Sequence, residues 1–393
     1  MERAKYWDKR ALQRLTESEQ ISKTGIRQIQ DIYTQAFKNL KQELNDIYRN
    51  YSMETGLDVS KLKQLLTKSQ TDKVWKQLKK QGLDKYVLAN YKARISRVEE
   101  LQAQIYSRIK LANQYEKNIL VKTFRSVIYG TYYKTIYDTQ MGTGYDFQFN
   151  KLDDKLVDRF VNTKWSDVSF TDRCWYNNEV LAKEVSELIG GSILSGQSLS
   201  KTIKQMKERF DVEDYKIERL IRTETNYFHN QADKETYKEL GIKKYVCVAT
   251  LDNRTSKFCI KIDQKVFNYS DIKVGVNFPP FHPNCRCKTR GYVEGYEDTI
   301  KRRARNPFTN EYETIGHMSY SKWLFKMKER YGTDYAKLIE FHINHKFVNF
   351  FKSVINFCAW IFACSFGFSP KAANINGATN RNKNFLFMIF LLN

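Results

Sequence analysis

The first 140 residues repeat apolar side chains at intervals of three and four positions, which places them on one face of a helix. One run comprises Ile26, Ile29, Tyr33, Ala36, Leu40, Leu44, Ile47 and Tyr51, and another comprises Leu88, Tyr91, Ile95, Val98, Leu101, Ile105, Ile109 and Ala112. Between the two runs, Asp58 is expected to cap a short helix. Both runs are close to a heptad repeat, so residues 1–140 are predicted to form a helical hairpin or bundle with coiled-coil character.

The pattern changes after the segment 142–150, whose glycines and aromatic residues are typical of a linker. Helical periodicity returns over about 199–240, and then Lys244 to Ala249 has the β-branched and aromatic composition of a strand. A second short hairpin is expected around Asp263-Gln264. Residues 151–295 are therefore predicted to form one domain, and the fold class is α+β: a long N-terminal helical, coiled-coil-like part followed by a mostly helical domain with a small antiparallel sheet.

The C-terminal part of the chain has two different compositions. Residues 296–340 contain the basic cluster Lys301 to Arg305, for which a solvated loop is the favoured interpretation and phosphate contact the alternative, and then an amphipathic run over 319–332. Residues 341–393 contain no Asp or Glu and include the uncharged run Val354 to Phe368, which is shorter than a membrane span. We expect this atypical apolar tail to be poorly folded or out-of-frame rather than membrane-bound.

Charge and cysteine content narrow the classes of function. The 393 residues include 66 basic and 44 acidic side chains, a net charge of +22. This charge is typical of a protein with a polyanionic partner such as nucleic acid or an acidic protein surface, and a basic but otherwise ordinary soluble protein is the alternative. The N-terminus has no apolar core of a signal peptide. The seven cysteines have no regular spacing, which indicates reduced thiols rather than a disulfide framework.

The stretch from Tyr245 to Val293 concentrates the residues that suggest chemistry. It contains three of the five prolines and the potential zinc ligands Cys259, His282, Cys285 and Cys287. Four such ligands would close a structural tetrahedron around zinc, with Asp252 as a substitute ligand. Reduced structural cysteines are the alternative, because a Cys-x-Cys pair with one distant Cys is not among the strong zinc spacings.

Two other interpretations involve residues of this stretch. A nucleophilic Cys with His282 as its base would also need a third orienting group, and the sequence does not indicate one. The motifs Arg222-Thr223-Glu224 and Asp252-x-Arg254-Thr255 are instead expected to form a buried ion-pair network that joins a helix to a strand.

The succession of these motifs resembles the head-morphogenesis domain of tailed-phage minor head proteins, the Mu F-like family. The resemblance rests on Arg222-Thr223-Glu224, Leu251-Asp252-x-Arg254-Thr255, Cys259 and Pro280-x-His282-Pro283-x-Cys285-Arg286, and it is best over about 160–295. The helical N-terminal part also looks like members from phages of Gram-positive hosts. One departure is Gln264, where the family usually has a glycine in the turn, so the turn is expected to be looser or of another type.

The resemblance implies a minor capsid protein of a phage or prophage, present in few copies and not an enzyme. Relatives associate with the portal protein and assist DNA packaging or ejection; scaffold, major capsid protein and phage DNA are further partners. The implied location is the capsid interior or portal vertex of the virion, and the host cytoplasm during assembly. The alternative functions are a phage-delivered effector enzyme and a DNA-binding protein with a Cys/His metal site.

Overall fold

The computed structural model describes residues 2–53, 56–80, 95–143, 148–165, 169–292, 302–309 and 311–335. The chain divides into two compact units, Met1–Tyr320 and Ser321–Asn393, which are described separately. The predicted apolar tail, 341–393, lies outside the described residues. In the part of the chain that is described, no helix combines the length and the apolar character needed to cross a membrane.

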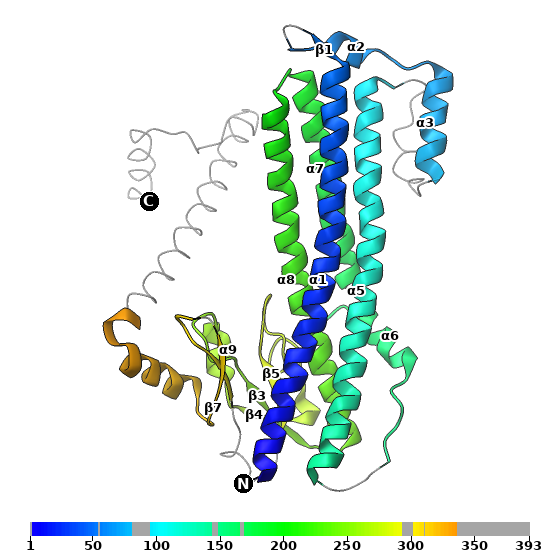
Figure 1. Cartoon of the computed structure of the whole chain (residues 1–393). Coiled ribbons are helices and arrows are strands. Elements are labelled where there is room, and N and C mark those ends of the chain that lie inside the picture. The colour runs from blue at the N-terminus through cyan, green and yellow to red at the C-terminus, as the bar shows by residue number, and fades with distance from the viewer. Residues whose placement is uncertain are drawn as a thin grey trace, which may run out of the picture. The chain divides into compact units, whose positions relative to one another are not determined.

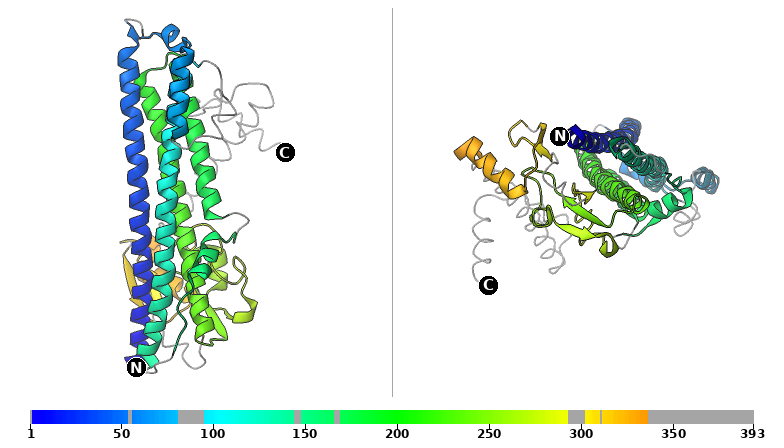
Figure 2. Two further views of the ribbon diagram at one scale, coloured as in Figure 1. Left: turned by 90° about the vertical axis from the view of Figure 1, so that its right-hand side faces the viewer. Right: turned by 90° about the horizontal axis from the view of Figure 1, so that it is seen from below.

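Four long helices lie side by side in the first unit (Figures 1 and 2). They are α1 (Glu2–Asn50), α5 (Arg97–Thr143), α7 (Phe170–Leu194) and α8 (Leu199–Glu239). The apolar stripes recognised in the sequence face inward: Ile29, Tyr33, Leu40 and Leu44 of α1 are at most 1% exposed. The prediction of a long N-terminal helical part is confirmed.

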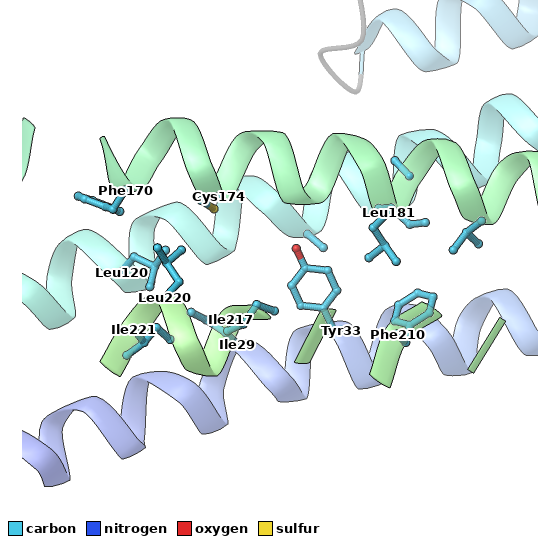
Figure 3. Packing of buried hydrophobic residues seen from close by; sticks show 14 of the residues in the cluster. Ile29, Tyr33, Leu120, Phe170, Cys174, Leu181, Phe210, Ile217, Leu220 and Ile221 are labelled. Carbon is cyan, nitrogen blue, oxygen red and sulfur yellow. The ribbon is translucent and has the colours of Figure 1, made fainter. Parts of the chain in front are cut away.

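One continuous apolar core joins the N-terminal helices to the helices that follow residue 151. Phe124 of α5 lies between Phe170 of α7 and Phe228 of α8, with ring centroids 4.9 and 4.8 Å away. Tyr33 of α1 meets Phe210 of α8 edge to face, as the close-up in Figure 3 shows. Each stripe therefore buries its apolar surface against the others.

Shorter elements connect the long helices. The strands β1 (Ser52–Met53) and β2 (Gly56–Leu57) pair with each other, and the helices α2 (Val59–Lys63), α3 (Lys68–Lys80) and α6 (Asp154–Asn162) follow. Asp58 caps α2 as predicted, because its side chain accepts a hydrogen bond from the backbone N–H of Lys61. Ser169 and Asp172 form a reciprocal capping box at the start of α7.

A three-stranded antiparallel sheet follows α8, in the order β4-β3-β5. Its strands are β3 (Lys244–Val248), β4 (Val266–Asn268) and β5 (Lys288–Gly291), and a short 3-10 turn, η1 (Tyr269–Asp271), follows β4. β3 matches the predicted strand, and the fold class, α+β with a small antiparallel sheet, is confirmed. The sheet lies beside the C-terminal half of α8, against which β5 packs (Figure 1).

The predicted second hairpin around Asp263 is wrong. Residues Lys257–Ile262 form a helix, α9, instead of a strand. Ser256 starts this helix, because its hydroxyl accepts from the backbone N–H of Cys259. Gln264 then turns the chain with a φ of 64°, the left-handed conformation that glycine adopts most easily.

The basic cluster is not a solvated loop, contrary to the favoured interpretation. β6 (Arg302–Arg305) pairs with β7 (Tyr312–Ile315) in an antiparallel ribbon. Arg302 is buried and donates to both carboxylate oxygens of Asp263, at 2.8 and 2.9 Å. The charge of Arg302 is therefore paired inside the protein. The predicted amphipathic run is helical over 320–335, as expected.

Candidate metal centre

Three of the four predicted zinc ligands meet in one cluster. Cys259 lies on α9, and His282 and Cys285 lie in the proline-rich segment before β5. One donor atom from each of the three lies within 4.8 Å of the others. Cys259 Sγ is 3.1 Å from His282 Nε2 and 4.0 Å from Cys285 Sγ. Cys287, just before β5, is buried in contact with the other two cysteines.

The hydrogen bonds of His282 determine which ring nitrogen can act as a ligand. Nδ1 lies 2.8 Å from the carbonyl oxygen of Pro283, and a carbonyl only accepts, so Nδ1 carries the proton. Nε2 is then the acceptor, and it faces Cys259 Sγ and the hydroxyl of Ser256, which is 2.9 Å away. The lone pair of Nε2 therefore points at the thiol cluster. This is the arrangement found where histidines bind metals.

The sulfurs are reduced and share their hydrogen bonds. The 4.0 Å between Cys259 Sγ and Cys285 Sγ is about twice a disulfide bond length. The thiols of Cys259 and Cys287 donate to Cys285, which lowers the pKa of Cys285. The same contact with Cys285, together with burial, raises the pKa of Cys259 to about 12.

One face of α8 holds the ligand segment in place. The Oγ1 of Thr223 accepts from the backbone N–H of Asn284 at 2.8 Å. Asn226 donates its amide N–H to the carbonyl of Cys285 at 2.6 Å. Asn230 accepts from the backbone N–H of Thr289 at 3.0 Å. Positions 223, 226 and 230 follow helical spacing, so a single polar stripe of α8 determines the path from Asn284 into β5.

Asp252 has partners other than the cysteine cluster. Its carboxylate takes two hydrogen bonds from the guanidinium of Arg286, one of them at 2.8 Å. It also accepts from the backbone N–H of Arg254 and the hydroxyl of Thr255, both at 3.0 Å. These bonds close the turn after β3, and they give both carboxylate oxygens donors from the protein. Asp252 does not belong to the cluster of donors, so the structure does not support it as a substitute metal ligand.

The prediction that Arg222-Thr223-Glu224 and Asp252-x-Arg254-Thr255 pair with each other is wrong, because their charged residues have other partners. Glu224 is buried, pairs with Arg173 of α7 at 3.0 Å, and accepts from the indole N–H of Trp165 at 2.9 Å. Burial raises the pKa of Glu224 to about 7. Arg222 pairs with Glu218 on its own helix. The first motif therefore joins α8 to α7.

Asn226, Asn230 and Ser256 were not among the predicted site residues. Asn226 and Asn230 carry a recognisable signal: amides that recur at helical spacing on a stripe which continues the apolar face of α8. Ser256 carries the N-cap signal three residues before Cys259. Recognising either role needed the knowledge that 257–262 is a helix and that 284–289 crosses α8.

The contact between Cys259 and His282 also has the geometry of a nucleophile and its base, with the Pro283 carbonyl as the orienting group. Two observations speak against that use. Cys259 is only 2% exposed, so a substrate has no access to its sulfur. Its raised pKa also keeps it a thiol, whereas the thiolate is the reactive form.

The candidate centre lies inside a segment that matches the model of a known protein family. Residues 183–290 match the family model described as phage Mu protein F like protein. This segment is Mu F-like. The match begins within α7 and ends in β5, so it contains α8, α9 and all four of the predicted zinc ligands.

Comparison with curated proteins and with solved structures finds no significant match for this chain.

Proposed function

We propose that the chain is a minor head protein that associates with the portal protein during procapsid assembly and assists DNA packaging or ejection. It would work in the host cytoplasm during assembly and reside in the capsid interior or at the portal vertex. The observation that carries the proposal is the Mu F-like segment at 183–290. Scaffold and major capsid proteins are the other candidate partners.

The bundle offers a rigid surface for such an association. The outward face of α1 carries a polar stripe of exposed residues that runs along about five turns of the helix. The stripe comprises Arg27, Asp31, Thr34, Lys38, Lys41 and Asn45. The opposite face of α1 packs on α5 and α8, which fixes the position of the stripe on the bundle. We infer that this stripe contacts the portal protein.

Co-purification tests the association. The full chain is co-expressed with the portal protein encoded in the same phage genome, and complexes are measured by affinity capture and size-exclusion chromatography. We expect a complex with the unaltered chain and at least about tenfold weaker capture with Arg27→Glu/Lys38→Glu/Lys41→Glu, because like charges across an interface disfavour association.

A matched control changes three exposed lysines away from α1. The variant Lys183→Glu/Lys201→Glu/Lys204→Glu has the same change in net charge and should bind as the unaltered chain does. Equal loss in both variants would assign the effect to net charge and reject the α1 stripe. Failure of the unaltered chain to bind the portal protein, together with its absence from mature particles, would reject the proposed function.

A second candidate function, direct contact with single-stranded DNA, is favoured by a pocket of about 930 Å³ beside α7 and α8. Three cations and three aromatic rings are among its lining residues: Arg173, Lys216, Arg219, Trp165, Trp175 and Tyr176. Trp175 and Tyr176 are 55% and 64% exposed, so their rings are open to stacking. Rings beside cations are the usual means of binding single strands without sequence preference.

Fluorescence anisotropy with a labelled oligothymidylate tests this contact. Binding to the full chain should weaken steeply with salt, and Trp175→Ala/Tyr176→Ala should weaken it roughly tenfold or more, since each stacked base is worth about 1–3 kcal/mol. Tyr115→Ala, which removes a ring that is 63% exposed on α5, is the control. No binding at low salt would exclude this function.

A further inference from the structure

We propose that Cys259, His282, Cys285 and Cys287 bind one zinc ion in a closed, structural, tetrahedral site. Zinc prefers sulfur and imidazole ligands, and four protein ligands leave no open coordination position. The proposal rests on the geometry of the side chains alone and is independent of any association with the portal protein.

The spacing of the donor atoms is close to that of a zinc tetrahedron. With usual bond lengths, two sulfurs on one zinc lie about 3.8 Å apart, and a sulfur and a nitrogen about 3.5 Å apart. Cys259 Sγ and Cys285 Sγ are separated by 4.0 Å, and Cys259 Sγ and His282 Nε2 by 3.1 Å. For these two pairs, shifts of a few tenths of an ångström would suffice.

Cys287 is the fourth ligand. It is 2% exposed and packs against Cys259 and Cys285, and its thiol exchanges hydrogen bonds with both. Its sulfur is not one of the three donor atoms that lie within 4.8 Å of one another, so its side chain would have to move toward the other donors to complete the tetrahedron. Thiols form only weak hydrogen bonds, and zinc would replace those within the cluster with coordination.

The surroundings already hold the ligands as metal sites require. The Pro283 carbonyl accepts the Nδ1 proton of His282, which directs Nε2 at the sulfurs. Asn226 binds the Cys285 carbonyl, and the backbone N–H of Cys285 donates to the carbonyl of His282 at 3.0 Å. The ligands are therefore positioned by backbone contacts that do not depend on the metal.

Zinc would join two segments that share little apolar core. These are α9 and the proline-rich segment that leads through Cys287 into β5. Among the described residues, the apolar cluster next to them has five buried members: Tyr237, Tyr245, Cys247, Ile262 and Phe278. A metal that cross-links both segments compensates for a small core, because its binding free energy contributes directly to folding.

Metal analysis of the purified full chain, made without a histidine tag in zinc-supplemented medium, tests the proposal. We expect about one zinc per chain after dialysis against a weak chelator. Cobalt substituted for the zinc should show sulfur-to-metal charge transfer and the intense visible bands of tetrahedral coordination. A folded wild-type chain that lacks both zinc and this cobalt spectrum would overturn the proposal, with no variant needed.

Single substitutions then assign the ligands. Cys259→Ser, Cys285→Ser and Cys287→Ser should each lower the affinity for zinc at least tenfold, whereas Cys174→Ser, at a buried thiol in the bundle, should keep it. Circular dichroism confirms that each measured variant is folded. Unchanged zinc affinity in Cys287→Ser would reject the four-ligand site. A folded Cys259→Ser or Cys285→Ser that binds zinc as tightly as wild type would reject the site altogether.

Discussion

The helical bundle and the Cys/His region, residues 244–291, are held together by different interactions. The bundle packs large apolar side chains along four long helices, and one buried cluster extends from Ile26 to Ala232. The Cys/His region has short strands, and specific hydrogen bonds hold its segments in place, such as those of Asn226 and Asp252. Bundle packing tolerates exchange of one apolar residue for another of similar size, whereas these bonds require particular donors and acceptors.

α8 belongs to both parts and shows why they can share one helix. Its N-terminal half presents apolar residues such as Met206, Phe210 and Ile217 to the bundle. Its C-terminal half also packs Phe228 into this core, and it buries Thr223, Asn226 and Asn230, each of which bonds to the segment 284–289. A helix can therefore act as a packing surface in both halves and, in its C-terminal half, also as a hydrogen-bonding template.

The largest expected loss of stability comes from a substitution in the core of the bundle. Phe124→Ala should lower the free energy of unfolding by about 3–5 kcal/mol, because it leaves a cavity between Phe170 and Phe228. Chemical denaturation of the full chain measures this loss. Tyr115→Ala on the same helix, at an exposed ring, should change stability by about 0.5 kcal/mol or less. A comparable loss in both variants would show that burial is not the cause.

The next largest loss of stability is expected when the ion pair that joins β6 to the turn after α9 is removed. Asp263→Asn should cost about 3 kcal/mol, since Arg302, whose side chain is only 1% exposed, would keep a buried charge without its partner. The matched control is Asp211→Asn, whose partner Lys207 is exposed, and we expect a change of at most about 0.5 kcal/mol. Thermal denaturation of both variants decides whether this pair stabilises the fold.

A smaller effect tests the polar stripe of α8. Asn226→Ala should cost about 1–3 kcal/mol, because the carbonyl of Cys285 would remain buried without a donor. Hydrogen exchange should show the loss concentrated in the Cys/His region and not in the bundle. Asn118→Ala, at an exposed position on α5, should leave exchange unchanged. Uniform loss of protection would mean that the two regions unfold together.

The pH dependence of stability tests the bundle separately from the Cys/His region. Burial raises the pKa of Glu116 to about 7, although Tyr33 donates a hydrogen bond to this carboxyl. A raised pKa means that the folded protein holds a proton which the unfolded chain releases above its ordinary pKa of about 4.5. This contribution to stability is therefore present below about pH 4.5 and is lost as the pH rises to about 7.

Glu116→Gln should remove this loss and make the protein more stable than wild type above pH 7, by on the order of 2 kcal/mol. Urea denaturation between pH 5 and pH 8 measures the difference, using conditions of matched ionic strength. An identical pH dependence in wild type and variant would rule out Glu116 as the titrating group.

The smallest effect concerns the turn after α9. Gln264→Gly should raise stability by about 1 kcal/mol or less, because glycine relieves the left-handed backbone, although the contact with His317 is lost. Gly241→Ala provides the converse, with a φ of 66° and open space around the added carbon. We expect this variant to be destabilised by about 1 kcal/mol. Thermal denaturation compares the two.

Periodicity predicted the helices well and the turn regions poorly. The stripe from Ile26 to Tyr51 predicts a helix because burial repeats with the helical period, and the structure has that helix in α1. Residues 257–262 contain apolar residues that fit a strand or a helix equally well. The cap by Ser256 decided for the helix, and the strand assignment failed.

The sequence named residues that lie close together in the structure, but it did not predict their contacts. Cys259, His282 and Cys285 meet as expected, since residue type and chemistry can be read directly from a sequence. The partners of Asp252 and Glu224 could not be predicted from the sequence, because several cationic residues could have paired with each carboxylate. Only the packing of α7 on α8 places Arg173 beside Glu224, and only the path of 284–289 places Arg286 beside Asp252.

The sequence by itself therefore determined the long helices, the strand at 244–248, the Mu F-like character of the central segment and the identity of the potential ligands. These follow from local spacing and residue chemistry, which do not depend on distant contacts. The tertiary structure alone decided that the basic cluster is a paired strand and that a stripe of α8 positions the thiols. Such contacts join residues far apart in sequence, and their energies exist only once the helices and loops have packed.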